Sequence, residues 1–87
     1  TDSSAASDVY KRQPSIDIDN LVSKISKKYS HVEQNVIDGL KLEFEDEWVH
    51  LRKSNTEPII RIYAESKDVE KANMLASRFV EEVKSLM

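Results

Sequence analysis

The sequence predicts an α+β domain in which two helices cover one face of an antiparallel sheet of four or five strands. Apolar residues recur at three- and four-residue steps in residues 19–30 and again from Val69 onward, as in amphipathic helices. Between residues 32 and 65 they alternate with polar residues instead, as in half-buried strands. The order is strand, helix, four strands, helix, which lets both helices bury their apolar stripes against one sheet.

The composition limits the class of protein. A chain of 87 residues has room for one small domain with a single core. The apolar fraction of 39% and the charged fraction of 33% are typical of soluble globular proteins, and no apolar run is long enough to span a membrane. The net charge of −3 disfavours sequence-independent binding to nucleic acid. The lack of cysteine rules out a disulfide framework and fits a cytoplasmic protein. We therefore expect neither nucleic acid nor membrane as a partner.

The N-terminal residues lack the material for a core. Residues 1–8 are small and polar, so we expect a disordered leader or a remnant of cloning, with the domain itself spanning 9–87. Residues 9–16 predict a short strand, which Pro14 limits to an edge position or to its end.

The first helix is predicted over residues 19–30. Asp17 or Asp19 can supply the N-cap oxygen. Lysines gather near its end, where the helix dipole favours cations and where we expect a solvated face. The apolar stripe consists of Ile18, Leu21, Val22, Ile25 and Tyr29.

The middle of the chain predicts several strands joined by turns. Asp38-Gly39 predicts a type I′ turn or a bulge. Three strands follow it, with the sequences LKLEF, EWVHLR and PIIRIYAES. The residues predicted to face the helices are Leu40, Leu42, Phe44, Val49, Leu51, Ile60, Ile62 and Ala64.

The last helix has the clearest pattern, since its apolar stripe contains neither glycine nor proline. Ser66 or Asp68 can cap its start. The stripe consists of Val69, Ala72, Ala76, Phe79, Val80, Val83 and Met87.

The segment RKSNTEP, residues 52–58, joins two strands without a glycine. Arg52 offers a planar fork for two phosphate oxygens, and Ser54, Asn55 and Thr56 offer hydroxyls, an amide and backbone N–H groups. These residues suit a phosphate site, although serine, asparagine and threonine are also ordinary turn residues. We expect Glu57 to order the loop by pairing with a neighbouring basic residue, and Pro58 to stiffen the backbone where the loop enters the next strand. Arg61, three residues further along that strand, is expected to point toward the same phosphate site.

This segment, together with IIRIYAE after it and NVIDGLKLEFEDEWVHLR before it, resembles the phosphate-binding loop of the α-D-phosphohexomutases. The resemblance covers Val9 to Met87 and implies the C-terminal domain of such an enzyme, with a TATA-binding-protein-like fold. It implies that the domain clamps the phosphate that is not transferred while 1-phospho and 6-phospho sugars interconvert. By this resemblance the residues that contact the substrate phosphate are Arg52, Ser54, Asn55, Thr56 and, more weakly, Arg61. Glu57 and Pro58 are expected to order the loop.

The resemblance also implies partners that lie outside this chain. A full phosphohexomutase has four domains, a phosphoserine, Mg²⁺ and a sugar bisphosphate intermediate. This chain has neither the phosphoserine loop nor the metal loop of that family, so we expect no catalytic residue, no metal ligand and no activity from it alone. The expected partners are a phosphosugar and the other domains of the parent enzyme.

Asn55 bears on the choice of sugar. Bacterial phosphoglucosamine mutases usually have glycine at this place, so Asn55 favours a phosphoglucomutase or phosphomannomutase. Phosphoglucosamine mutase remains an alternative, and so does a stand-alone module that binds an anion or a protein.

The aromatic residues near the loop have simpler interpretations. We expect Trp48 and Tyr63 to pack on the sheet or against a neighbouring domain. His31 and His50 lack the spacing of a metal site and are expected at the surface.

Overall fold

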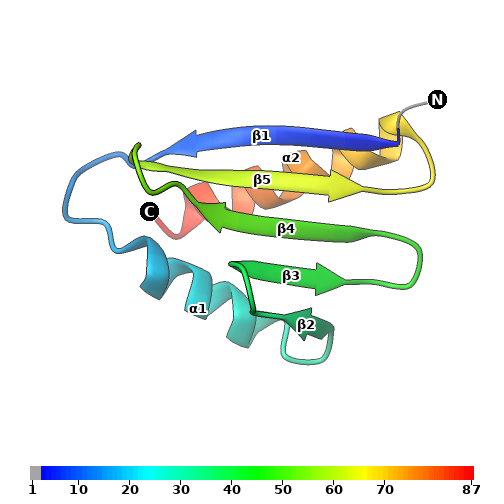
Figure 1. Cartoon of the computed structure of the whole chain (residues 1–87), viewed down its shortest axis with the longest axis horizontal. Coiled ribbons are helices and arrows are strands. Elements are labelled where there is room, and N and C mark those ends of the chain that lie inside the picture. The colour runs from blue at the N-terminus through cyan, green and yellow to red at the C-terminus, as the bar shows by residue number, and fades with distance from the viewer. Residues whose placement is uncertain (1–2) are drawn as a thin grey trace.

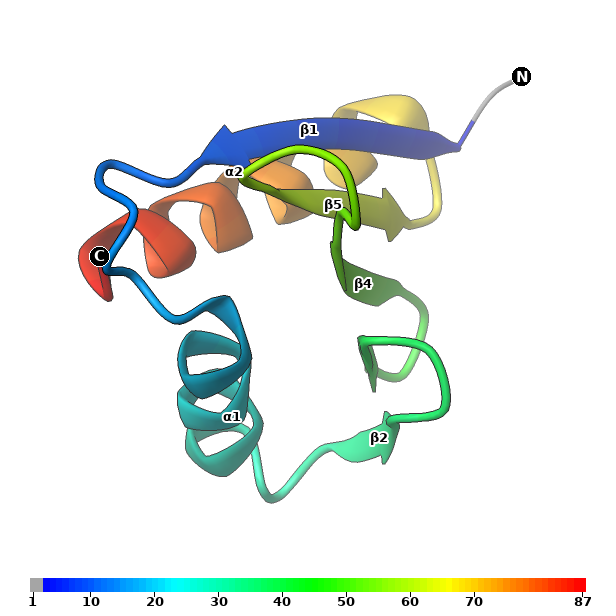
Figure 2. The ribbon, with the colours of Figure 1, turned by 60° about the vertical axis from the view of Figure 1, so that its left-hand side comes forward.

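The computed structural model describes residues 3–87, which form one five-stranded antiparallel sheet with two helices on one face (Figures 1 and 2). The strand order is β1-β5-β4-β3-β2. The predicted fold class and element order are therefore confirmed. The elements are β1 (Ser4–Tyr10), α1 (Ile18–Lys28), β2 (Glu33–Asn35), β3 (Leu40–Glu43), β4 (Trp48–Lys53), β5 (Ile59–Glu65) and α2 (Val69–Ser85).

The N-terminal segment corrects one expectation. Residues 4–8 are not a disordered leader, because they belong to β1, which pairs with β5 from Ser4↔Glu65 to Tyr10↔Ile59. Val9 of β1 is buried and Ala5 packs against the core, under the cover of α2. Backbone pairing and this cover give the segment the stability that its small side chains cannot supply. Residues 1 and 2, also assigned to the leader, lie outside the described residues.

Each helix begins at one of the two caps predicted for it. The Asp17 side chain accepts a hydrogen bond from the Asn20 N–H at 3.2 Å, so Asp17 and not Asp19 caps α1. The Asp68 side chain accepts one from the Lys71 N–H at 2.8 Å and caps α2. Ser66, the alternative cap, is buried and donates a hydrogen bond to Glu47 instead, with 2.7 Å between Oγ and Oε1.

The core lies between the helices and the inner face of the sheet, as the alternation in the strands predicted. Two details of α2 differ from its predicted stripe. Leu75 is buried although it was not assigned to the stripe, and Val69, at the first position of the helix, remains 47% exposed. The buried cluster contains Val9, Ile18, Leu21, Ile25, Tyr29, Leu40, Leu42, Val49, Leu51, Ile60, Ile62, Ala64, Leu75, Ala76, Phe79 and Val83.

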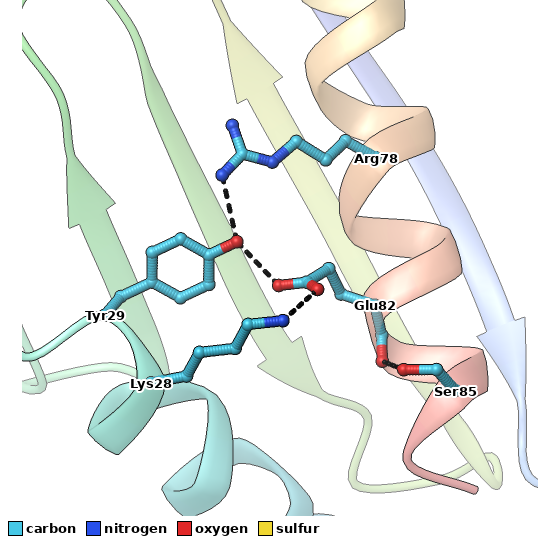
Figure 3. Close-up of polar contacts among 5 residues, drawn as sticks. All are labelled: Lys28, Tyr29, Arg78, Glu82 and Ser85. Atoms are coloured by element: carbon cyan, nitrogen blue, oxygen red, sulfur yellow. Dashed lines mark hydrogen bonds and ion pairs between the residues drawn. The ribbon is translucent and has the colours of Figure 1, made fainter.

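A polar network joins the end of α1 to α2 (Figure 3). The buried Tyr29 hydroxyl donates to Glu82 at 2.6 Å and accepts from Arg78 at 2.9 Å. Lys28 donates to the second oxygen of Glu82 at 2.5 Å, while the Lys28 side chain stays exposed, as the predicted solvated face requires. Burial raises the pKa of Glu82, but the hydrogen bonds from Lys28 and Tyr29 outweigh burial and leave this pKa below its usual value.

The helices within residues 3–87 also bear on membrane insertion. Neither of them combines the length and the apolar character that crossing a bilayer requires.

Candidate anion-binding site

The segment between β4 and β5 forms a tight loop at one end of the sheet (Figure 1). The Ser54 hydroxyl accepts hydrogen bonds from the backbone N–H groups of Thr56 at 3.3 Å and Glu57 at 3.2 Å. The Ser54 N–H donates to the Ile59 carbonyl at 3.2 Å, which closes the base of the loop. Within residues 3–87, no residue other than glycine has a positive φ, so the loop turns without the left-handed backbone that glycine supplies in many hairpins. A serine hydroxyl shapes this loop.

The far side of the loop is tied to the end of β1. The Pro58 carbonyl accepts a hydrogen bond from the Lys11 N–H at 2.8 Å, and the Glu57 carbonyl accepts one from the Ile59 N–H at 2.8 Å. Among residues 3–87 the Glu57 carboxylate makes no ion pair, so the predicted pairing with a neighbouring base is absent there. Glu57 acts on the loop through its backbone.

The structure brings the two predicted arginines together. Arg52 of β4 lies directly opposite Arg61 of β5 in the strand register, on the sheet face that points away from the helices. Like charges that lie directly opposite destabilise a sheet unless they are compensated. Aspartates supply this compensation on both sides.

The two ion pairs differ in geometry. Arg61 donates twice to Asp8 of β1, with distances of 2.8 Å from Nε and 3.1 Å from Nη2. These hydrogen bonds hold the pKa of Asp8 below its usual value and raise the pKa of Arg61. Arg52 Nη2 lies 3.2 Å from Asp38 Oδ2, which is longer than either contact of Arg61. Arg61 is thus held firmly in a fork, whereas Arg52 retains free donors.

Sequence reasoning missed Asp38, which it interpreted only as part of a turn. Gly39 after it has a φ of +72°, and a Cβ there would lie 2.3 Å from the Leu51 carbonyl oxygen. The Asp38 carbonyl also lies in close hydrogen-bonding contact with Nε2 of His50. These contacts fix the turn against β4, beside Arg52. The Asp-Gly dipeptide was the only sequence signal, because it required a turn without saying what the turn would meet.

A third ion pair lies at the same end. Lys53, the last residue of β4, binds Asp19 in the first turn of α1 at 3.0 Å. Both residues border a groove of about 390 Å³ between α1 and the turn that contains Gly39. Three basic side chains around the loop, Arg52, Lys53 and Arg61, are therefore each paired with an aspartate from a different segment.

The remaining candidate residues are placed as follows. Asn55 and Thr56 are exposed at the tip of the loop. Trp48 lies at the start of β4, at the opposite end of that strand from the loop, where its indole N–H donates to Glu65 at 3.1 Å. Tyr63 lies on the outer face, with its ring 6.3 Å from that of His50.

The remaining histidine follows the C-terminal end of α1. His31 is exposed and its ring stacks on Tyr29 at 6.2 Å. Across residues 3–87, no three histidine, aspartate or glutamate side chains converge as metal ligands would.

Fold and loop together define a class of small α+β domain that presents a polar loop beside two arginines at one end of an antiparallel sheet. Sequence comparison identifies the family. The phosphoglucomutase/phosphomannomutase C-terminal domain family matches residues 8–82, and the chain belongs to this family. The family predicted from the loop motif is confirmed.

Relatives from several archaea agree with this assignment. The chain is 43% identical over 67 residues to a phosphoglucosamine/phosphogalactosamine mutase of Sulfurisphaera tokodaii, a match that covers 75% of this chain and 15% of the relative. It is 36% identical over 62 residues to a probable phosphoglucosamine mutase of Methanopyrus kandleri, covering 71% and 13%. A phosphoglucomutase/phosphomannomutase of Thermococcus kodakarensis is 60% identical over 35 residues, covering 40% and 8%. The chain thus spans less than a sixth of the length of these curated relatives.

Proposed function

We propose that this chain is the part of a phosphohexomutase that holds the phosphate of the sugar that is not being transferred. The observation that carries the proposal is the convergence of Arg52, Arg61 and the serine-shaped loop at one end of the sheet. In this proposal Arg52 grips two phosphate oxygens, while Ser54, Asn55 and Thr56 supply hydroxyl, amide and backbone donors. Arg61 adds positive charge from the neighbouring strand.

The proposed mechanism consists of positioning and electrostatics. A hydrogen bond to a charged group contributes about 1.5–3 kcal/mol, so a few of them can hold a phosphate in one place. A loop that is already ordered before binding loses little entropy when the phosphate arrives. The resulting orientation of the sugar would assist phosphoryl transfer elsewhere in the parent enzyme.

The chemical step itself belongs to other parts of the parent enzyme in this proposal. The acidic residues of residues 3–87 do not converge into a site that would fit Mg²⁺, and Asp17, one of the acidic pair at the start of α1, caps a helix. The partners that we propose are a phosphosugar and the remaining domains of the parent enzyme. Phosphorylated sugars are retained inside cells because of their charge, so we expect the enzyme in the cytoplasm.

Two substrate classes fit the proposal. Asn55 favours glucose or mannose phosphate by the family comparison made from the sequence. Two relatives that match most of this chain are named a phosphoglucosamine/phosphogalactosamine mutase and a probable phosphoglucosamine mutase, which favours an amino sugar as a second candidate. Measuring kcat/KM of the parent enzyme with glucose, mannose and glucosamine phosphates would distinguish the neutral sugars from the amino sugar.

Titration of the ¹⁵N-labelled chain with inorganic phosphate tests the proposal. We expect saturable amide shifts in residues 52–61 and none at the opposite end of the sheet, because the phosphate should contact only the loop and its flanking arginines. The Arg52→Ala variant should lose these shifts. Binding that persists unchanged in a folded Arg52→Ala chain, or no shifts in the unaltered chain, would contradict the proposal and favour a stand-alone module with another ligand.

A further inference from the structure

Three basic side chains around the loop, Arg52, Lys53 and Arg61, are neutralised before any phosphate arrives. Asp38, Asp19 and Asp8 come from the turn before β3, from α1 and from β1, and each takes one of the three cations. These three cations are therefore ion-paired and do not form a bare positive patch. A phosphate that binds here has to compete with carboxylates for guanidinium and ammonium groups.

The ion pair of Arg52 is the one built for exchange. Its Nη2–Oδ2 distance of 3.2 Å is longer than both contacts between Arg61 and Asp8, and its side chains are 47% and 65% exposed. An exposed pair of this kind contributes little net free energy, so a dianion with several oxygens can replace it. Arg61 and Asp8 make two short contacts, which join the edge strand β1 to β5. We therefore expect a phosphate to displace Asp8 from Arg61 less easily than Asp38 from Arg52.

The position of Asp38 is fixed by its backbone and not by Arg52. Gly39 packs against the Leu51 carbonyl, and the Asp38 carbonyl contacts His50. The Asp38 backbone therefore stays beside Arg52 and keeps the carboxylate within reach of the guanidinium. A phosphate at Arg52 would lie near a fixed negative charge, which lowers its affinity.

We propose that Asp38 is a built-in counterion of the phosphate clamp: it occupies Arg52 in the free domain, yields Arg52 to the phosphate on binding, and thereby limits the affinity of the site. This inference rests on the proposed function, because it assumes that Arg52 binds phosphate. In this inference Asp38 sets the affinity of the site for phosphate. Asp38 is neither a catalytic residue nor a ligand of the phosphate. Weak binding of this kind lets a clamp release its ligand readily.

The variant Asp38→Asn isolates the charge. Asparagine has nearly the same size and shape as aspartate and is an ordinary turn residue, so the fold should survive. The asparagine oxygen can also still accept a hydrogen bond from Arg52, which preserves the orientation of the guanidinium. Asp46→Asn is the matched control, because Asp46 has a similarly exposed ion pair, with Lys67 at 3.5 Å, at the other end of the sheet. Both variants change the net charge equally.

Titration with inorganic phosphate, followed by the amide shifts of residues 52–61, gives the dissociation constant for each variant. We expect Asp38→Asn to bind phosphate about two- to fivefold more tightly than the unaltered chain, the competition that an exposed ion pair provides. Asp46→Asn should leave the constant unchanged.

Three outcomes decide the matter. If Asp38→Asn equals Asp46→Asn, or binds more weakly than the unaltered chain, the counterion role is wrong. If Arg52→Ala still binds phosphate like the unaltered chain, the proposed function itself fails, and this inference fails with it. If Arg52→Ala loses binding while Asp38→Asn gains it, both stand.

Discussion

The Ser54 hydroxyl is the side-chain group that holds the tip of the loop, so Ser54→Ala is the most informative change at the site. It removes the acceptor for the N–H groups of Thr56 and Glu57. Both residues are exposed and water can replace the lost partner, so we expect the free energy of unfolding to fall by only about 1 kcal/mol. The effect on binding should be larger, because ordering one residue costs about 1–2 kcal/mol. If phosphate has to order even one loop residue, its dissociation constant rises about five- to thirtyfold.

Two measurements separate loop order from direct contact. Amide hydrogen exchange without phosphate should become faster at Thr56 and Glu57 in Ser54→Ala, since their acceptor is gone. Phosphate titration of the same sample should give the weaker binding. Ser54→Thr, which keeps a hydroxyl, is the control and should restore both values toward those of the unaltered chain. Unchanged exchange and unchanged phosphate affinity in Ser54→Ala would refute the idea that this hydroxyl shapes the site.

Three further changes test the scaffold by chemical denaturation. Gly39→Ala should lower the free energy of unfolding by more than about 1 kcal/mol, because the new Cβ would lie 2.3 Å from the Leu51 oxygen at a positive φ; a neutral effect would contradict that packing. Asp68→Ala should cost about 1 kcal/mol by removing the cap of α2, and an unchanged free energy would mean that another group caps the helix. Glu82 has a folded-state pKa below its usual 4.5, so its contribution is present above pH 4.5 and is lost as the pH falls through the folded pKa. Glu82→Gln should therefore destabilise the domain at neutral pH and flatten the loss of stability below pH 4.5, whereas an unchanged acid profile would exclude this role.

Most of the sheet and both helices could be predicted because their signals are local. Alternation identified the inner faces of β3, β4 and β5, and helical spacing identified the buried sides of α1 and α2. The strand β1 could not be predicted over residues 4–8, because its stability comes from pairing with β5, at the other end of the chain. A short polar strand of this kind carries almost no signal of its own.

The candidate site divides in the same way. The loop residues and both arginines were predicted from the sequence, and the strand register explains why Arg61 lies beside Arg52. The aspartates that neutralise this end were missed, since Asp8, Asp19 and Asp38 reach their partners only through the tertiary fold. The sequence placed Asp8 in a leader, Asp19 at a helix start and Asp38 in a turn. None of these local assignments indicates which basic side chain the carboxylate will meet.

The steady-state kinetics of the parent phosphohexomutase with Arg52→Ala test the central claim most directly. Loss of two charged hydrogen bonds to the phosphate corresponds to about 3 kcal/mol or more, so kcat/KM should fall at least about a hundredfold. Lys67→Ala, which removes an ion-paired cation at the opposite end of the sheet, is the control and should leave kcat/KM nearly unchanged. A folded Arg52→Ala enzyme with the kcat/KM of the unaltered enzyme would contradict the claim that this domain holds the substrate phosphate.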